Sequence, residues 1–270
     1  MKINFLRIIL LLIIVASCND DGNIPITRKS IYHGEYYNLV KAISNNNTNE
    51  MQDLVTKYSL DVNHRDSVYG ITLLEWALDN YKKKAFKKLL DMGANPNFRD
   101  SISHIPVILQ ASKLQDIDYL QYCLDHKGNP NITSVIDTTN GDSYTTPLSA
   151  ATNGRAENIN LLVKYGADVN YSPDNFVPLT SALVLDLTSA LTLLKHGVDP
   201  KKVRYATLNR GTLNICQMLR EIEEVIPSDD YTTKMAIVKY LKDRYNIDYF
   251  ATNIPEAVKK SHDATYLSKY

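Results

Sequence analysis

The sequence predicts an all-α solenoid of about six helix–turn–helix units, with β-hairpin-like fingers between the units and a helical cap at the C-terminal end. Three observations predict this fold. Two apolar segments of about 8 and 10 residues follow one another within residues 145–170. Asn63, Asn97 and Asn131 recur at intervals of 34 residues. Helices this short cannot bury an apolar face alone, so each pair needs similar neighbours stacked against it.

The stretch from Thr145 to Asn170 defines one unit. Pro147 suits the first turn of a helix, where its missing N–H costs nothing, and Asn153-Gly154 ends that helix. A second helix then runs to Gly166, a residue suited to the left-handed conformation that closes helices. One unit is therefore a helix, a turn and a second helix in about thirty residues.

Other parts of the chain repeat this unit. The Thr-Pro-Leu of residues 146–148 is echoed at residues 72–74, 105–107 and 177–179. This pattern resembles the ankyrin repeat, which has a period of about 33 residues and the signature T-P-L-H-x-A. The resemblance covers residues 36–200 and implies the fingers and paired helices of that family. Four residues stand where the signature has histidine: Glu75, Ile108, Ser149 and Thr180.

Units one to five occupy residues 31–200, with unit ends at residues 63, 97, 131, 170 and 200. Apolar spacing predicts helices over residues 36–44 and 51–57 in unit one. It also predicts an outer helix over residues 117–124 in unit three. Each unit should therefore contribute one helix to an inner layer and one to an outer layer.

The pattern degrades in residues 201–270, which we interpret as a degenerate sixth unit followed by a cap. Apolar spacing predicts helices over residues 206–225 and 235–245, with an insertion near residues 221–230. A last helix is expected within residues 255–270, where it would cover the open end of the array. Terminal units of a solenoid are expected to be atypical, because one of their faces meets water.

The interval between units three and four is longer than the others. Residues 132–146 hold β-forming residues on both sides of Asn140-Gly141. Asn-Gly between such residues is a strong hairpin signal, so we expect a lengthened finger here. Long loops on a rigid scaffold often carry binding, and the finger is therefore a candidate partner contact; the alternative is a solvated insertion.

The N-terminal segment is predicted to be a lipoprotein signal. Residues 1–17 have a short basic start and an apolar run too short to span a membrane. Val15-Ala16-Ser17-Cys18 resembles a bacterial lipobox, which implies a lipid on Cys18 and a membrane anchor. Asn19 then implies the outer membrane, on its periplasmic face or at the surface, and residues 18–30 would be a flexible tether. An ordinary secretory signal or a retained anchor is the alternative.

Composition excludes some partners. The 30 basic and 30 acidic residues balance, so no positive excess favours nucleic acid. The 18 tyrosines suit protein interfaces, because tyrosine offers a large contact area at low entropic cost; a wet helical surface is the alternative role. We expect a monomer that contacts the membrane through its N-terminal lipid and binds another protein.

No motif for catalysis, a metal or a cofactor is recognised in the sequence. The six histidines lack paired spacing and cysteine partners, and no phosphate-binding glycine loop or nucleophile motif occurs. His126 and His196 precede unit-ending turns, where we expect them to bond helical carbonyls. Cys123 and Cys216 are predicted to be buried free thiols. We therefore expect a protein that is not an enzyme, and no cofactor.

The resemblance to ankyrin repeats implies a concave binding face made of fingers and inner helices. Carried over position by position, it assigns finger residues Tyr69, Ile71, His104, Tyr144, Thr145, Phe176 and Val177. On the inner helices it assigns Glu75, Asp79, Ile108, Ser149, Asn153, Thr180 and Val184. Exposed aromatic residues in this set would act as anchors for a partner.

Three hypotheses for function follow. The first is an immunity protein that neutralises a secreted antibacterial toxin by binding it and occluding its active site. The second is a scaffold or adaptor of an envelope protein complex. The third is an enzyme with a site between repeats, for which the sequence offers no motif.

Overall fold

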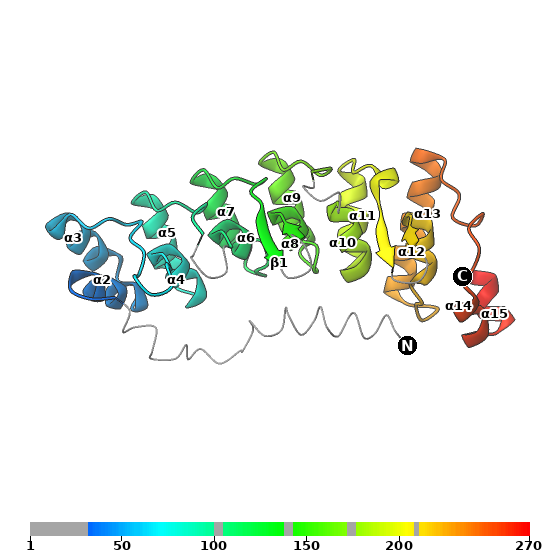
Figure 1. Ribbon diagram of the computed structural model, residues 1–270, viewed down its shortest axis with the longest axis horizontal. Coiled ribbons are helices and arrows are strands. Elements are labelled where there is room, and N and C mark those ends of the chain that lie inside the picture. Colours follow the sequence, from blue (N-terminus) through cyan, green and yellow to red (C-terminus); the bar gives the residue numbers. More distant parts are fainter. Residues whose placement is uncertain (1–31, 100–104, 138–142, 172–176, 208–210) are drawn as a thin grey trace.

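Paired helices arranged along one axis make up most of the computed structural model, which describes residues 32–99, 105–137, 143–171, 177–207 and 211–270 (Figure 1). Within these ranges the chain is mostly helical, as expected for an all-α repeat fold. The predicted signal segment, Cys18 and the tether lie outside the described residues. So do His104, Phe176 and residues 138–142 of the predicted finger. None of the helices in the described ranges is long and apolar enough to cross a membrane.

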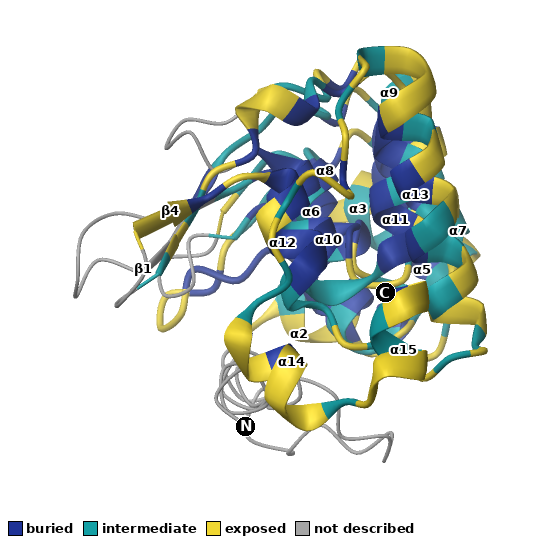
Figure 2. Cartoon of the chain, turned by 90° about the vertical axis from the view of Figure 1, so that its right-hand side faces the viewer, coloured by how far each residue is buried: buried dark blue, intermediate teal, exposed yellow. Residues whose placement is uncertain are grey.

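Five successive helix pairs follow the predicted order. They are α2 (Glu35–Ser44) with α3 (Thr48–Tyr58), α4 (Leu73–Asp79) with α5 (Lys83–Asp91), α6 (Val107–Ala111) with α7 (Ile117–Asp125), α8 (Pro147–Ala150) with α9 (Ala156–Lys164), and α10 (Pro178–Leu185) with α11 (Leu187–Lys195). The first helices of the pairs pack on one another in an inner layer, and the second helices pack in an outer layer. Figure 2 looks along these layers and shows the inner helices between the outer helices and the strands.

Local sequence sets the helix boundaries. The Thr72 and Thr146 hydroxyls accept hydrogen bonds from the backbone N–H of Glu75 and Ser149, at 3.1 and 3.2 Å, and so cap α4 and α8. This bond satisfies a donor that the first helical turn leaves without an intrahelical partner. Pro147 occupies the first turn of α8, as predicted. Gly166 has a φ of 88°, in the left-handed region that a closing glycine adopts most easily.

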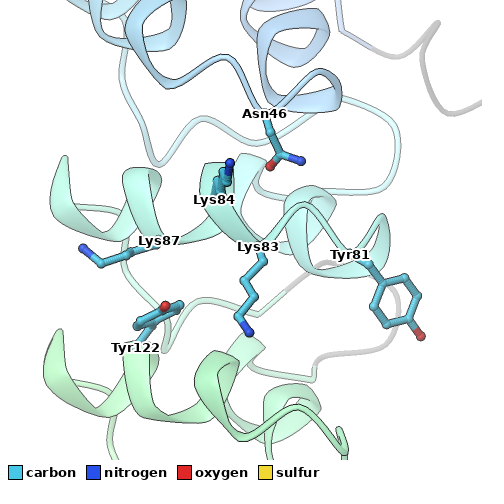
Figure 3. Close-up of a pocket in the computed structure, with 6 residues that line it drawn as sticks. All are labelled: Asn46, Tyr81, Lys83, Lys84, Lys87 and Tyr122. Carbon is cyan, nitrogen blue, oxygen red and sulfur yellow. The ribbon is translucent and has the colours of Figure 1, made fainter.

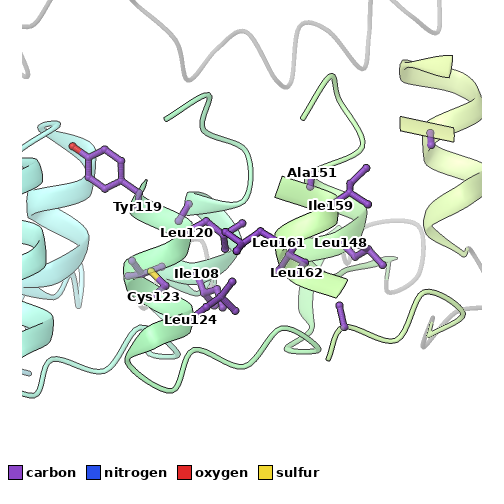
Figure 4. Close-up of a cluster of buried hydrophobic side chains, with 14 of the residues drawn as sticks. Ile108, Tyr119, Leu120, Cys123, Leu124, Leu148, Ala151, Ile159, Leu161 and Leu162 are labelled. Carbon is purple, nitrogen blue, oxygen red and sulfur yellow. The ribbon is translucent and has the colours of Figure 1, made fainter. Parts of the chain in front are cut away.

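The core lies between the two helix layers and continues from pair to pair. Figure 4 shows its middle part, where Ile108, Leu120 and Cys123 of one pair lie beside Leu148 and Leu162 of the next. These five side chains are at most 1% exposed. Burial of apolar surface contributes about 25 cal/mol per Å², so stacking supplies the stability that a single short pair lacks.

Four asparagines connect the units through an asparagine ladder. Asn63, Asn97 and Asn131 each donate from Nδ2 to a main-chain carbonyl of the next unit, at 3.2, 2.9 and 3.0 Å. Each also accepts a hydrogen bond on Oδ1, at 2.7–2.8 Å, from the main-chain N–H of the residue two positions after that carbonyl. Asn170 accepts in the same way from Asp199 N at 2.9 Å. The 34-residue spacing of asparagine in the sequence is therefore the spacing of these inter-unit bonds.

The predicted finger between units three and four is a hairpin in its described part. Strands β1 (Ser134–Asp137) and β2 (Ser143–Thr145) are antiparallel, with Ser134 opposite Thr145 and Val135 opposite Tyr144. Elsewhere, single bridges join Arg65 to Thr72 and Arg99 to Pro106 at the bases of two shorter fingers. The extra residues of the sequence interval thus lengthen an element that its neighbours also have.

The structure after Pro200 differs from the prediction of one long helix. Residues 206–225 are not a single helix: β3 (Tyr205–Thr207) and β4 (Gly211–Leu213) form a hairpin, and α12 spans only Ile215–Glu221. Asn214 starts α12 through a capping box with Gln217, which prevents the helix from beginning earlier. The apolar spacing that predicted one helix comes partly from the hairpin.

Two further C-terminal boundaries also differ from the prediction. Helix α13 spans Asp229–Tyr245 and begins before residue 235, because Ser228 caps it. The expected last helix is two short ones, α14 (Glu256–Ser261) and α15 (Ala264–Lys269), because Asp263 starts a new helix. Helix α12 packs on α10 and α13 packs on α11, so both layers continue to the C-terminal region.

Candidate functional site

The strands and finger loops lie on the inner-helix side of the array, away from the outer helices (Figure 2). Neighbouring fingers are tied to each other. The Arg65 guanidinium lies over the Phe98 ring at 4.9 Å, and the Arg99 guanidinium donates to the carbonyl oxygen of Thr133. These contacts join the fingers at residues 65–72, 99–106 and 133–145 in a connected row, which we call the finger row. A preorganised row loses less entropy on binding than separate loops would.

The finger at residues 65–72, just before α4, has a tip that is held by several hydrogen bonds. Both carboxylate oxygens of Asp66, which is only 4% exposed, accept backbone N–H bonds: Oδ1 from Val68 and Tyr69, and Oδ2 from Ile71, at 2.6–2.9 Å. The loop they fix presents Val68 and Tyr69, which are 59% and 38% exposed. Sequence reasoning selected Tyr69 but missed Val68. An aspartate followed four residues later by glycine is a turn signal that could have indicated this tip.

Several other candidate residues reach the surface. Asn153 is exposed at the turn after α8, whereas Asp79, Thr145, Ser149 and Val184 are half-buried. Tyr144 lies in β2, opposite Val135. Asn153 had been assigned to an inner helix but lies beyond its end, whereas Tyr69 and the other residues belong to the fingers and the inner helices as assigned.

Five candidate residues are buried, which corrects the sequence-based assignment. The side chains of Ile71, Glu75, Ile108, Val177 and Thr180 are at most 5% exposed. The inner helices pack directly on one another, so positions near their first turns face the neighbouring unit instead of solvent. Glu75, for example, accepts a hydrogen bond on Oε1 from Gln110 Nε2 of the next inner helix at 3.2 Å. These residues hold units together and present no surface to a partner.

The histidines have structural contacts. The ring of His126 bonds the Tyr122 carbonyl through Nδ1 at 2.9 Å, as predicted, and also contacts Asp91. His196 bonds the Thr192 and Leu193 carbonyls through its main-chain N–H, and its ring contacts Asn160 Oδ1 of the preceding outer helix through Nε2 at 2.7 Å. His64 stacks on Tyr36. In the part of the chain that the structure describes, no group of three potential metal ligands occurs.

Cys123 and Cys216 are buried free thiols, as predicted. Burial raises the pKa of both thiols. A thiol that stays protonated is a poor nucleophile, so neither cysteine has the environment of a reactive group.

The outer layer carries a separate surface hollow of about 490 Å³ between α5 and α7. It is lined by Asn46, Tyr81, Lys83, Lys84, Lys87 and Tyr122, which Figure 3 shows as sticks. We call it the Tyr81 hollow. Lys83 donates to Asp116 at 2.8 Å and contacts Asp118, and these bonds raise the pKa of Lys83. Lys87 pairs with Asp91 at 2.9 Å and lies over the Tyr122 ring.

Comparison with protein families gives one match. The ankyrin repeat model matches residues 144–174, which contain α8, α9 and the last two residues of β2, and this supports an ankyrin-repeat family. No curated protein matches the chain. The matched segment is the unit that the sequence pattern identified most clearly, and it suggests a module for protein–protein interaction, which is typically not enzymatic.

Proposed function

We propose that residues 31–245 form an ankyrin array of about six units that binds another protein through its finger row. The match at residues 144–174 and the stacking of the helix pairs in two layers support this proposal. Residues 246–270 would cap the array. The chain would act by binding and not by catalysis.

The observation that carries the proposal is the exposed pair Val68 and Tyr69 on a finger fixed by the buried Asp66 carboxylate. An aromatic and an aliphatic side chain on a rigid loop can be buried by a partner with little loss of conformational entropy. The hairpin of β1 and β2 stands further along the same row and would add a second contact.

For the biological role, we propose an immunity protein held in the bacterial envelope by a lipid on Cys18. The lipobox-like Val15-Ala16-Ser17-Cys18 supports the anchor, and Asn19 after it supports an outer-membrane location. A binding array fixed at the membrane would meet an incoming secreted toxin before the toxin reached its target. Occlusion of the toxin's active site by the finger row would be the mechanism.

Affinity capture tests this proposal. The detergent-solubilised full chain is offered to secreted and envelope fractions, beside a variant in which residues 136–143 are replaced by a short Asn-Gly turn. Capture of one secreted hydrolase, inhibited at equal molar amounts by the chain and less well by the variant, would support the immunity role. Capture of resident envelope proteins alone would point to a scaffold or adaptor and would exclude the toxin hypothesis.

A further inference from the structure

Tyr81 adopts an unusual backbone conformation. Its φ is 53°, in the left-handed region, and its side chain is 64% exposed. Asn46 occupies the same place in the preceding helix pair, with a φ of 52° and the same pattern of closing backbone bonds. Asparagine tolerates this conformation, whereas a bulky residue there is strained. A tyrosine at this turn therefore costs stability through its backbone conformation.

The ring of Tyr81 stands at the rim of the Tyr81 hollow, and Tyr122 lies on the opposite side, from α7 (Figure 3). Lysines of α5 separate the two rings. Lys83 is engaged by Asp116 and Asp118, and Lys87 by Asp91. No ion pair joins Lys84 to another residue in the described part of the chain, and its side chain is exposed. The hollow thus combines two aromatic edges with an ammonium group available to an incoming anion.

The flanking charges limit what kind of anion fits. Asp91, Asp116 and Asp118 stand at the edges of the hollow, so an extended anionic surface would meet repulsion there. A lipid headgroup layer and a nucleic-acid backbone are surfaces of that kind. A short peptide segment can place one or two carboxylates near Lys84 and avoid the aspartates. Its neighbouring apolar side chains can then contact the tyrosine rings.

We propose that the Tyr81 hollow is a second docking surface, which takes an acidic segment of a protein partner between Tyr81 and Tyr122. This surface lies on the outer layer, away from the finger row, so it does not depend on the proposed immunity role. A partner could occupy both surfaces at once, in which case the two contacts would reinforce each other through effective concentration. The strained Tyr81 backbone is the stability cost of this surface.

Fluorescence anisotropy with a labelled peptide of about eight residues, in which two glutamates lie between leucines, tests the charge requirement, because removing one well-placed charge pair changes affinity by about tenfold. The full chain should bind the peptide, and binding should weaken as salt is raised. Lys84→Glu should reduce affinity about tenfold without breaking an ion pair among the described residues. The matched control is Lys201→Glu, an exposed lysine of the 3₁₀ turn at Pro200–Lys202, which should bind normally.

Tyr81→Gly tests the aromatic requirement separately from folding. Because glycine accepts the left-handed conformation, the variant should melt at the same temperature as the parent or higher, yet bind the peptide several times more weakly. Unchanged binding by Tyr81→Gly or by Lys84→Glu would overturn the proposal, as would equal losses in the Lys201→Glu control. Equal binding of phosphatidylglycerol vesicles or of a single-stranded oligonucleotide would also overturn it. The capture experiment for the finger row uses substitutions at other residues, so its outcome is independent of the outcome of this test.

Discussion

Asn97 joins its own unit to Asn129 of the next, accepting the Asn129 backbone N–H on Oδ1 at 2.7 Å while donating from Nδ2 to the Lys127 carbonyl at 2.9 Å. Both partners are main-chain groups of the turn after a helix, where no helical hydrogen bond is available to them. One side chain therefore satisfies two groups of the neighbouring unit at once. The ladder is the polar counterpart of the leucine core between the same units.

Asn97→Ala should lower the free energy of unfolding by about 1–3 kcal/mol, because it leaves both main-chain groups without this partner. Urea denaturation followed by circular dichroism would measure the change. Asn49→Ala is the control: Asn49 is exposed on α3, and alanine there should be neutral or slightly stabilising. Equal effects of the two substitutions would show that the ladder contributes nothing specific.

Cys123 should be unreactive toward thiol reagents in the folded chain and react at the rate of unfolding. Its side chain is fully buried and the pKa of its thiol is raised by burial. Cys123→Ser should destabilise the chain by about 1–3 kcal/mol, because a hydroxyl replaces a thiol in an apolar site. Labelling kinetics in increasing urea, on a Cys18→Ser and Cys216→Ala background that leaves Cys123 as the single thiol, would measure its reactivity. Urea denaturation of Cys123→Ser would measure the change in stability. Fast labelling in native buffer would contradict the prediction.

Lys234 should make stability depend on pH. Burial first, and then repulsion from Arg220, lower the pKa of Lys234 to about 7, whereas Glu223 and Glu224 raise it by less. In the unfolded chain the pKa returns to about 10.4. Between pH 7 and about 10 the unfolded state therefore binds more protons, so the Lys234 contribution to stability rises with pH and is least favourable below pH 7.

Lys234→Met should remove this dependence and stabilise the chain more at pH 6 than at pH 9.5. The substitution also removes the Lys234 donor from the Ile222 carbonyl, and the Tyr270 hydroxyl, 3.2 Å from that carbonyl, already donates to the Arg220 carbonyl. This loss is similar at every pH, so it leaves the difference between pH 6 and pH 9.5 unchanged. Urea midpoints at several pH values would measure the difference. Work below pH 9.5 avoids ionisation of Tyr249 and Tyr270, whose pKa values are raised by burial. If the urea midpoints of parent and variant changed in parallel with pH, Lys234 would not be the source of the pH dependence.

Tyr69→Ala should weaken partner capture by tenfold or more, with a change in unfolding free energy within about 0.5 kcal/mol, because exposed anchors contribute to binding and not to the core. Val68→Ala should weaken capture by a smaller factor. Tyr58→Ala, an exposed tyrosine at the end of outer helix α3, is the matched control and should capture normally. Loss of capture in the control would place the interface elsewhere.

Features that depend on local sequence could be predicted. Pro147, Gly166 and the asparagine spacing each encode a turn or a cap, so the helix pairs and their order followed from them. The hairpin with strands at residues 205–207 and 211–213 did not, because Leu208, Ile215 and Met218 also match a helical period. Only the capping box at Asn214 distinguishes a hairpin followed by a short helix from one long helix.

Burial on the inner helices could not be predicted from the repeat pattern. Ile108 and Thr180 occupy positions that the family pattern assigns to the binding face, but the depth of packing depends on the adjacent helix. The left-handed backbone conformation of Tyr81 could not be predicted either, because tyrosine is not a residue type that indicates a positive φ. Both depend on contacts between units and not on the residues of one unit.

The asparagine ladder bears on how such a chain can change in length. Because Asn63, Asn97 and Asn131 recognise main-chain atoms, the junction between units does not require particular side chains in the next one. A duplicated or deleted unit would therefore meet a compatible neighbour without compensating substitutions at the turn. Gene duplication in whole-unit steps could lengthen or shorten the row of fingers and so adjust its reach to partners of different size.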